Sequence, residues 1–289
     1  MGILFGLLTA ASFAAGSVFA KIGQRTESDD DGVYTTLGVT VVLLGVAAAF
    51  AFKPPWSTSG FVALVVGGIT GSVFGRTLIL RAVRLIGPAR SSAFTTGTPI
   101  AAALAGWVAL GETVTLLEAM GGAITISGLL WLVRSRTAGG EGDPAPLRHY
   151  LIAAGAPIFF GTAFVIRKWG LERFDSALVA GFISATSAFI FLSVLAVIRH
   201  DAKLHVRRIT HANRWFVLGG AATAVAIMSQ FLAFGFLEAW VVGLLVGTQA
   251  IWALGFSAAL LKGEEHIDRN TVGAIIVVAL GVAVVGFQT

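Results

Sequence analysis

Ten long apolar runs follow one another along this chain almost without interruption. A helix needs about 20 mostly apolar residues to cross a bilayer, and each run approaches that length. The runs lack the apolar/polar alternation of barrel strands, and a lipid-exposed backbone must satisfy its own hydrogen bonds. The sequence therefore predicts an all-α integral membrane protein. We expect ten transmembrane helices near residues 2–21, 33–52, 60–82, 89–110, 114–133, 149–167, 176–198, 214–236, 239–261 and 270–287.

Composition agrees with a membrane protein and excludes several function classes. Of the 289 residues, 56% are hydrophobic and 12% charged, against about a quarter charged in soluble domains. Cysteine is absent, which excludes disulfides, thiolate metal sites and cysteine nucleophiles. The basic residues form short clusters at the ends of runs, so nucleic-acid binding is not indicated. No basic stretch precedes the first run, which we interpret as a retained helix.

The two halves of the chain resemble each other. The stretch from Phe13 to Gly23 aligns with that from Phe160 to Gly170, and Gly111-Glu112 aligns with Gly263-Glu264. We predict two five-helix units, residues 1–133 and 149–289, joined by a linker at 134–148. Because five is odd, the second unit enters the membrane in the opposite orientation. This inverted repeat is typical of secondary transporters that work by alternating access.

The ordered motifs of the two halves resemble those of the drug/metabolite transporter superfamily, specifically its ten-helix EamA-type members. The resemblance covers the whole chain. It implies the family fold and secondary transport of a small metabolite or drug, with a small-molecule solute and membrane lipid as partners. Its residues are Pro99, Gly111, Glu112, Gly121, Gly128, Gly263, Glu264, Gly273 and Gly281, whereas Ile251 stands where the repeat places Pro99.

Most of these motif residues have a structural interpretation. Glycines four residues apart, at 67, 71 and 75, share one helix face and predict close helix packing. Glu112 and Glu264 are expected in tight turns, where each carboxylate accepts backbone N–H groups at the start of the next helix.

Arg76 is the most costly polar residue inside a predicted span, by about 2.5 to 3.5 kcal/mol at a helix centre. Two interpretations are equally weighted. Arg76 snorkels to the interface as a structural residue, or it faces the cavity and binds a carboxylate or phosphate. Ser72 lies one turn earlier on the same face.

Uncharged polar residues cluster nearer the bilayer centre, in the fourth and ninth runs. Hydrogen bonding between helices is one explanation, and a polar lining of the transport path is the other. Thr96 and Thr248 are the preferred pair, and Gln230, Ser17, Phe160, Thr162 and Ser187 are weaker candidates. The predicted substrate-binding set is Arg76, Thr95, Thr96, Gln230, Thr248, Gln249 and Trp252, and we expect no catalytic residue, metal or cofactor.

Acidic residues and histidines lie outside the predicted spans or in a first turn. Proton exchange at a carboxylate buried in the bilayer is therefore disfavoured, while sodium coupling, uniport and solute exchange stay open. A membrane enzyme would need a convergent catalytic constellation, and none is visible. An amino-acid or organic-anion exporter is the leading hypothesis. A drug or neutral-metabolite exporter and a non-transporting membrane protein are the alternatives.

Fifteen of the 20 Lys and Arg residues lie in the loops after the odd-numbered runs. The positive-inside rule therefore predicts that both termini face outward, whereas the family resemblance implies cytoplasmic termini. We expect the protein in the inner (plasma) membrane of a prokaryote.

Overall fold

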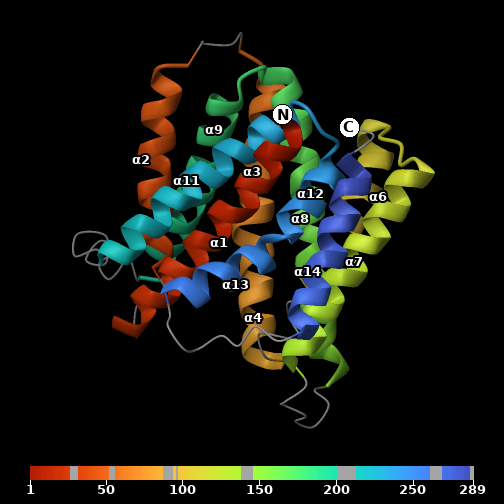
Figure 1. The fold of residues 1–289 in the computed structure, drawn as a ribbon. Helices are drawn as coiled ribbons and strands as arrows, with labels where there is room; N and C mark the ends of the chain where they lie inside the picture. The colour runs from red at the N-terminus through yellow and green to blue at the C-terminus, as the bar shows by residue number, and fades with distance from the viewer. Residues whose placement is uncertain are drawn as a thin grey trace.

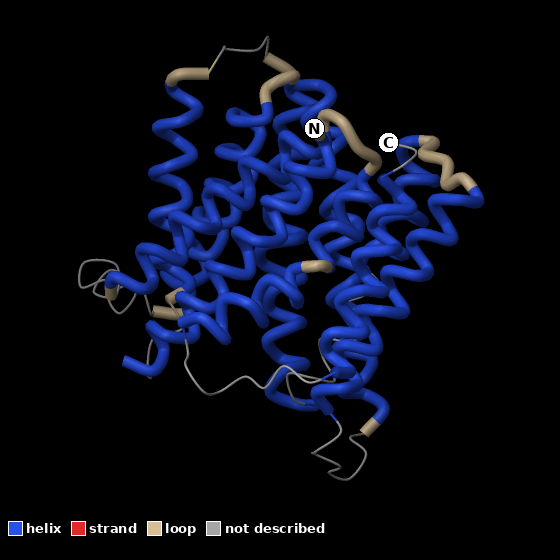
Figure 2. Tube along the Cα trace, viewed as in Figure 1, coloured by secondary structure: helices blue, strands red, loops and turns tan. Residues whose placement is uncertain are grey.

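A computed structural model describes residues 1–26, 32–51, 56–86, 94–95, 97–137, 146–200, 213–260 and 269–286. In these ranges the chain is helical apart from short connections, and no strand occurs (Figure 2). The helices of the first part are α1 (Gly2–Thr26), α2 (Val33–Ala49), α3 (Thr58–Ile69), the π-helix η1 (Thr70–Gly75), α4 (Arg76–Ile86), α6 (Thr98–Leu110) and α7 (Leu116–Thr137). Those of the second part are α8 (Leu147–Phe174), α9 (Ala177–Ile198), α11 (Arg214–Phe234), α12 (Ala239–Gly247), α13 (Gln249–Leu260) and α14 (Arg269–Gly286).

Six of the described helical stretches are long and apolar enough to cross a membrane. The prediction of an all-helical membrane protein is confirmed at this level. The six are Gly2–Arg25, Thr58–Leu78, Leu147–Phe174, Ala177–Ile198, Arg214–Phe234 and Ala239–Leu260. Shorter apolar helices cover Val33–Ala49, Thr98–Leu110, Leu116–Trp131 and Val272–Val285.

The bundle is built by pairing helices from the first part of the chain with helices from the second. α1 packs along α11, α3 and α4 along α8, α6 against α8 and α12, and α7 along α14 (Figure 1). Neither part therefore buries its helices by itself. The core is formed where α8, α11 and α12 meet their partners, and it includes Phe164, Phe231 and Trp240.

Glycines permit the closest of these crossings. A Cβ on Gly281 of α14 would lie 2.5 Å from the backbone nitrogen of Thr125 and 2.7 Å from the carbonyl oxygen of Gly121, both on α7. A Cβ on Gly128 would lie 2.8 Å from a Val278 methyl group. Small residues at these two positions let the backbones of α7 and α14 approach each other.

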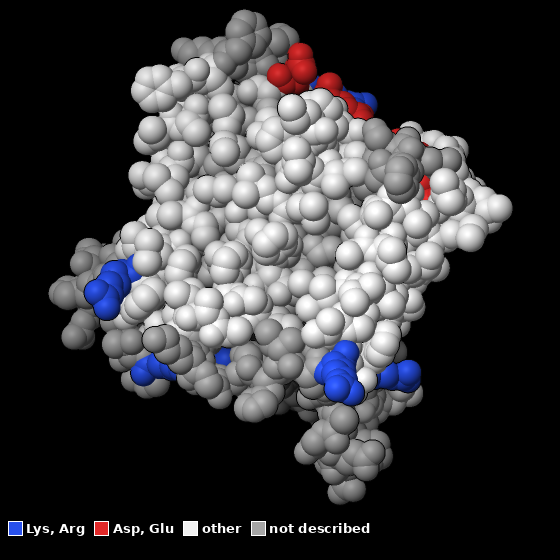
Figure 3. Space-filling view, viewed as in Figure 1, with Lys and Arg blue, Asp and Glu red and all other residues white. Residues whose placement is uncertain are grey.

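Charge separates along the long axis of the bundle. In Figure 3, acidic side chains gather at one end, Lys and Arg gather mainly at the other, and an uncharged band lies between them. The start of α1 and the end of α14 lie at the acidic end (Figure 1). A Cβ on Gly2 would contact Leu237, next to Glu238, which fixes the start of the chain beside these acids. We call the end that holds Gly2, Glu112 and Glu238 the acidic end.

Candidate functional site

A buried arginine on α8 lies at the centre of a polar cluster inside the bundle. Arg167 is 6% exposed. Its Nη1 donates a hydrogen bond to Gln230 Oε1 on α11 at 3.2 Å, and its Nη2 donates to Ser72 Oγ on η1 at 2.9 Å. These three residues, the arginine cluster, connect three helices that are far apart in the sequence.

The glycine face of α3 and η1 makes room for this arginine. A Cβ on Gly67 would lie 2.9 Å from Arg167 Cγ, and one on Gly71 would lie 3.3 Å from Nη2. Gly75 meets the ring of Phe160, one helix turn from Gly71. Ser72 stands within the six-residue π-helix, and such segments are frequent at functional sites. The glycines predicted to pack a helix therefore pack α8 at the level of its buried cation.

Arg167 has an unused donor. Its Nε is buried without a hydrogen-bond partner, and the two partners of the guanidinium, Gln230 and Ser72, are neutral side chains. Among the described residues no carboxylate forms an ion pair with it. A buried charge is costly unless it is paired, so a guanidinium held by neutral groups favours an anion as its missing partner.

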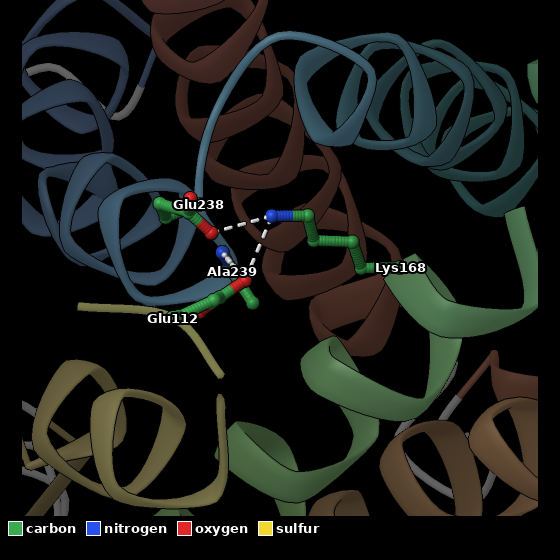
Figure 4. Close-up of polar contacts among 4 residues, drawn as sticks. All are labelled: Glu112, Lys168, Glu238 and Ala239. Atoms are coloured by element: carbon green, nitrogen blue, oxygen red, sulfur yellow. Dashed lines mark hydrogen bonds and ion pairs between the residues drawn. The ribbon is translucent and has the colours of Figure 1, made fainter. Parts of the chain in front are cut away.

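The next residue of α8 forms a second polar cluster, closer to the acidic end. Lys168 Nζ lies 2.7 Å from Glu112 Oε1 and 2.6 Å from Glu238 Oε2 (Figure 4). Glu112 comes from the connection between α6 and α7, and Glu238 directly precedes α12. We call Glu112, Lys168 and Glu238 the lysine cluster. One cation is shared there by two carboxylates from distant parts of the chain.

Glu112 is the buried member of the lysine cluster. Its Oε1 also accepts the backbone N–H of Ala239 at 3.1 Å, which caps the start of α12. Its Oε2 fits against Gly106, where a Cβ would clash with it, and has no hydrogen-bond partner. Burial, followed by the hydrogen bond to Glu238, raises the pKa of Glu112 to about 6. The pKa of Glu238 is lowered, because its hydrogen bonds to Glu112 and Lys168 outweigh its partial burial.

A cleft of about 550 Å³ opens beside the lysine cluster at the acidic end. Its wall contains four carboxylates and two phenylalanine rings as well as the lysine. The lining residues are Glu118, Lys168, Leu171, Glu172, Asp175, Phe234, Gly235, Phe236, Leu237 and Glu238. Among the described residues no group of three or more His, Asp or Glu side chains is arranged to hold a metal ion.

The structure brings one residue of the predicted substrate set, Gln230, to the arginine cluster. Arg76 is half-buried at the first residue of α4, four residues after Ser72. Thr95 is half-buried, and Thr96 lies outside the described residues.

The other three predicted residues lie at the junction of α12 and α13. The Thr248 hydroxyl donates to the carbonyl oxygen of Leu245 at 2.6 Å. Gln249 Nε2 donates to Ser17 Oγ on α1 at 3.2 Å. Trp252 is 40% exposed and stacks on Phe256. Thr248 thus bonds its own backbone, while Gln249 connects two helices.

The helix α12 is separated from α13 at Thr248, and a turn at Gly97 precedes α6. α12 ends before Thr248, whose N–H bonds to the Leu245 carbonyl at 3.0 Å, and α13 begins at the next residue. In the first half, the Gly97 N–H bonds to the Phe94 carbonyl at 2.9 Å just before α6 begins. Discontinuous helices are found at the binding sites of many transporters.

Sequence reasoning missed both cations of α8. The predicted span ended at residue 167, whereas α8 continues to Phe174 and buries Arg167. The signal was that Leu171 and Phe174 follow Arg167 by four and seven positions, which places all three residues on one helix face.

The cap predicted for Glu112 is also corrected. Glu112 caps α12 and not the next helix, α7. The start of α7 is instead capped by a reciprocal pair, Thr115 and Glu118. The backbone N–H and the hydroxyl of Thr115 each donate to Glu118 Oε2 at 2.8 Å, and the Glu118 N–H donates to the Thr115 hydroxyl oxygen at 3.3 Å. Glu264 lies outside the described residues.

The fold and its buried polar clusters define a polytopic helical membrane protein with charged residues in its core. The chain belongs to the EamA-like transporter family, whose model matches residues 1–134 and 147–287. The predicted family is therefore confirmed.

Two further similarities agree with this family. Human solute carrier family 35 member G1 is 26% identical over 207 residues, which is 68% of this chain and 56% of the human protein. The chain thus spans just over half the length of that relative. A solved crystal structure, described only as that of a protein, superposes with a TM-score of 0.69 at 20% identity, covering 99% of this chain and 96% of the other. That likeness shows the fold.

Proposed function

We propose that the protein is a secondary carrier of small organic anions, including amino acids, that works by alternating access in the plasma membrane of a prokaryote. The observation that carries this proposal is the arginine cluster. Arg167 is buried among neutral partners with Nε unpaired, so an incoming carboxylate would supply the charge that the bundle lacks.

A guanidinium suits this role because it can donate two parallel hydrogen bonds to one carboxylate. Ser72 and Gln230 hold Nη2 and Nη1, which orients the plane of the group. Ser72, Gln230 and the unpaired Nε would then meet the solute together. Arg76, Thr95, Thr96, Thr248, Gln249 and Trp252 remain proposed lining residues of the transport path.

The carrier mechanism rests on a proposed architecture of ten spans in two inverted repeats, residues 1–133 and 149–289, with a linker at 134–148. Three features support it. Helices pair across the two parts of the chain, α12 and α13 are separated at Thr248 while a turn at Gly97 precedes α6, and the start of α1 and the end of α14 lie at one end of the bundle (Figure 1). Two similar units packed against each other can adopt two nearly equivalent arrangements.

The charge distribution supports an orientation. The basic end of the bundle would face the cytoplasm and the acidic end, with both termini, would face outward (Figure 3). An exporter would then release its solute through the acidic end.

One observation favours a second solute class. The cleft at the acidic end combines the carboxylates of Glu118, Glu172 and Asp175 with the rings of Phe234 and Phe236. Such a surface suits a lipophilic cation, as in a drug exporter of the same fold. The arginine cluster lies deeper and has the opposite charge, so the anion proposal takes precedence.

Ligand-induced thermal stabilisation tests the proposed solute class. Purified wild-type protein would be heated with succinate, glutamate, glucose and tetraphenylphosphonium, each over a concentration series. A solute at about one hundred times its Kd stabilises the fold by about 2.7 kcal/mol. We expect Tm to rise with the carboxylates, Arg167→Gln to remove that rise, and the control Arg76→Gln to leave at least part of it.

Other outcomes overturn the proposal. A rise with tetraphenylphosphonium alone would favour the drug exporter, and a rise with glucose alone would favour a neutral solute. Carboxylate stabilisation that persists in Arg167→Gln would exclude the arginine cluster as the binding site.

A further inference from the structure

The lysine cluster joins three parts of the chain at the acidic end. Glu112 lies between α6 and α7, Lys168 lies in the last two turns of α8, and Glu238 precedes α12. The side chains of Glu112 and Lys168 are 4% and 11% exposed. The cluster therefore closes the bundle where the nearby cleft opens to solvent.

The charges of this cluster do not balance. With both carboxylates ionised, Lys168 neutralises only one of them, and a negative charge remains at a site where Glu112 is buried and Glu112 Oε2 has no partner. A single proton on Glu112 would make the cluster neutral and give Glu112 a donor for Glu238.

We propose that Glu112 is a proton-binding site and that the lysine cluster is a proton-dependent gate, closed at the acidic end when Glu112 is protonated and released when the proton leaves. The gate rests on the proposed carrier function, because closing one end of a bundle has a use only in alternating access. The proton would exchange with water in the cleft that Lys168 and Glu238 line.

Thermodynamic linkage gives the direction in which pH shifts the gate between its closed and open forms. Burial raises the pKa of Glu112 from 4.5 to about 6 in the closed form. In an open form, water around the carboxylate would return its pKa toward the usual value. A proton binds more tightly to the form with the higher pKa, so lowering the pH through about 6 favours closure and raising it favours opening.

Other charged groups near the cluster have different partners or lie in solvent. On α7, the Glu118 carboxylate accepts from the backbone N–H and hydroxyl of Thr115. On α8, Glu172 and Asp175 line the cleft and are exposed, and Arg167 donates into the arginine cluster. Glu112 is thus the carboxylate that the fold buries against Lys168.

The absence of cysteine makes the gate directly testable. Val242 on α12, one turn after Glu238, is 0% exposed. A membrane-impermeant maleimide would be reacted with a Val242→Cys variant in detergent, at about pH 5.5 and about pH 7.5. Because the thiolate is the reactive form, each rate is divided by the rate of the denatured protein at the same pH, which gives a corrected rate. The pKa of Glu112 is about 6 in the closed form and is taken as 4.5 in the open form, and the closed form predominates. The open fraction, and with it the corrected rate, should therefore be about fourfold higher at the higher pH.

Two variants identify the proton site. In Val242→Cys with Glu112→Gln, the neutral side chain should keep the corrected rate low at both pH values. In Val242→Cys with Glu238→Gln, the response should move to lower pH, because the hydrogen bond that protonated Glu112 donates to the Glu238 carboxylate is one cause of the raised pKa of Glu112. The matched control is Glu172→Gln on the same cleft, which should leave the response unchanged.

The proposal is overturned if the corrected rate is equal at both pH values, or if Glu112→Gln responds like the parent variant. No solute is used, so failure here is distinct from failure of the anion proposal. A pH response without any carboxylate binding would keep the gate and reject the solute class. Carboxylate binding without a pH response would do the reverse.

Discussion

Arg167 is the residue that we propose binds the solute, and it also lowers the stability of the ligand-free protein. A buried guanidinium without a counter-ion weakens the ligand-free fold, because pairing with Ser72 and Gln230 offsets only part of its desolvation. We predict that Arg167→Gln leaves the free energy of unfolding unchanged or raises it by up to about 2 kcal/mol while carboxylate binding is lost. Thermal unfolding of both proteins without solute measures this directly, and a large fall in Tm would mean that Arg167 is mainly structural.

Gly106 offers a second test at the same scale. Its missing Cβ leaves the space that Glu112 Oε2 occupies. Gly106→Ala should displace the carboxylate from Lys168 and Ala239, so we expect a loss of about 1 to 3 kcal/mol and loss of the pH-dependent labelling. Gly255→Ala is the control, since a Cβ there has no neighbour within 4 Å and alanine favours a helix. Equal stability of the two variants would contradict the packing described for Glu112.

At the scale of elements, the crossing of α7 and α14 depends on backbone contact. Gly281→Ala would push a methyl group into the Thr125 nitrogen and the Gly121 carbonyl, which a side-chain rotation cannot relieve. We predict a loss of at least about 1 to 3 kcal/mol, measured by thermal unfolding. On α7, Gly122→Ala is the matched control, because its Cβ would stand 3.5 Å from the Trp240 ring. If both variants unfolded at the wild-type temperature, α7 and α14 would not cross as described.

The sequence predicted the elements better than the site. Apolar runs and glycine spacing indicated a helical membrane bundle and its tight face, because both depend on neighbours within one helix. The partners of Arg167 come from residues 95 and 63 positions away, and Glu112 reaches Ala239 over 127 positions. Such contacts follow from how the two halves pack, which local patterns do not encode. Gln230 was only a weaker candidate in the sequence, because nothing local shows that Arg167 would be its partner.

At the scale of the whole molecule, the separation of charge predicts the orientation. Ser59, at the start of α3, is exposed near the acidic end, where Gly60 meets Arg173 and Phe174. Leu147 begins α8 at the opposite end and is 73% exposed. In intact cells, an impermeant maleimide should label Ser59→Cys at once and Leu147→Cys only after the membrane is broken. The reverse pattern would put both termini in the cytoplasm.

The central claim is that this bundle carries a small organic anion past Arg167, and counterflow in proteoliposomes tests it most directly. Vesicles loaded with unlabelled succinate or glutamate would be diluted into the same labelled solute, with wild-type, Arg167→Gln or Arg76→Gln protein. We expect labelled solute to accumulate in vesicles with wild-type protein and, measurably, with Arg76→Gln. With Arg167→Gln we expect no accumulation above that of empty vesicles. Accumulation with Arg167→Gln at the wild-type rate, or none with any anion in wild-type vesicles that exchange a cationic or neutral solute, would contradict it.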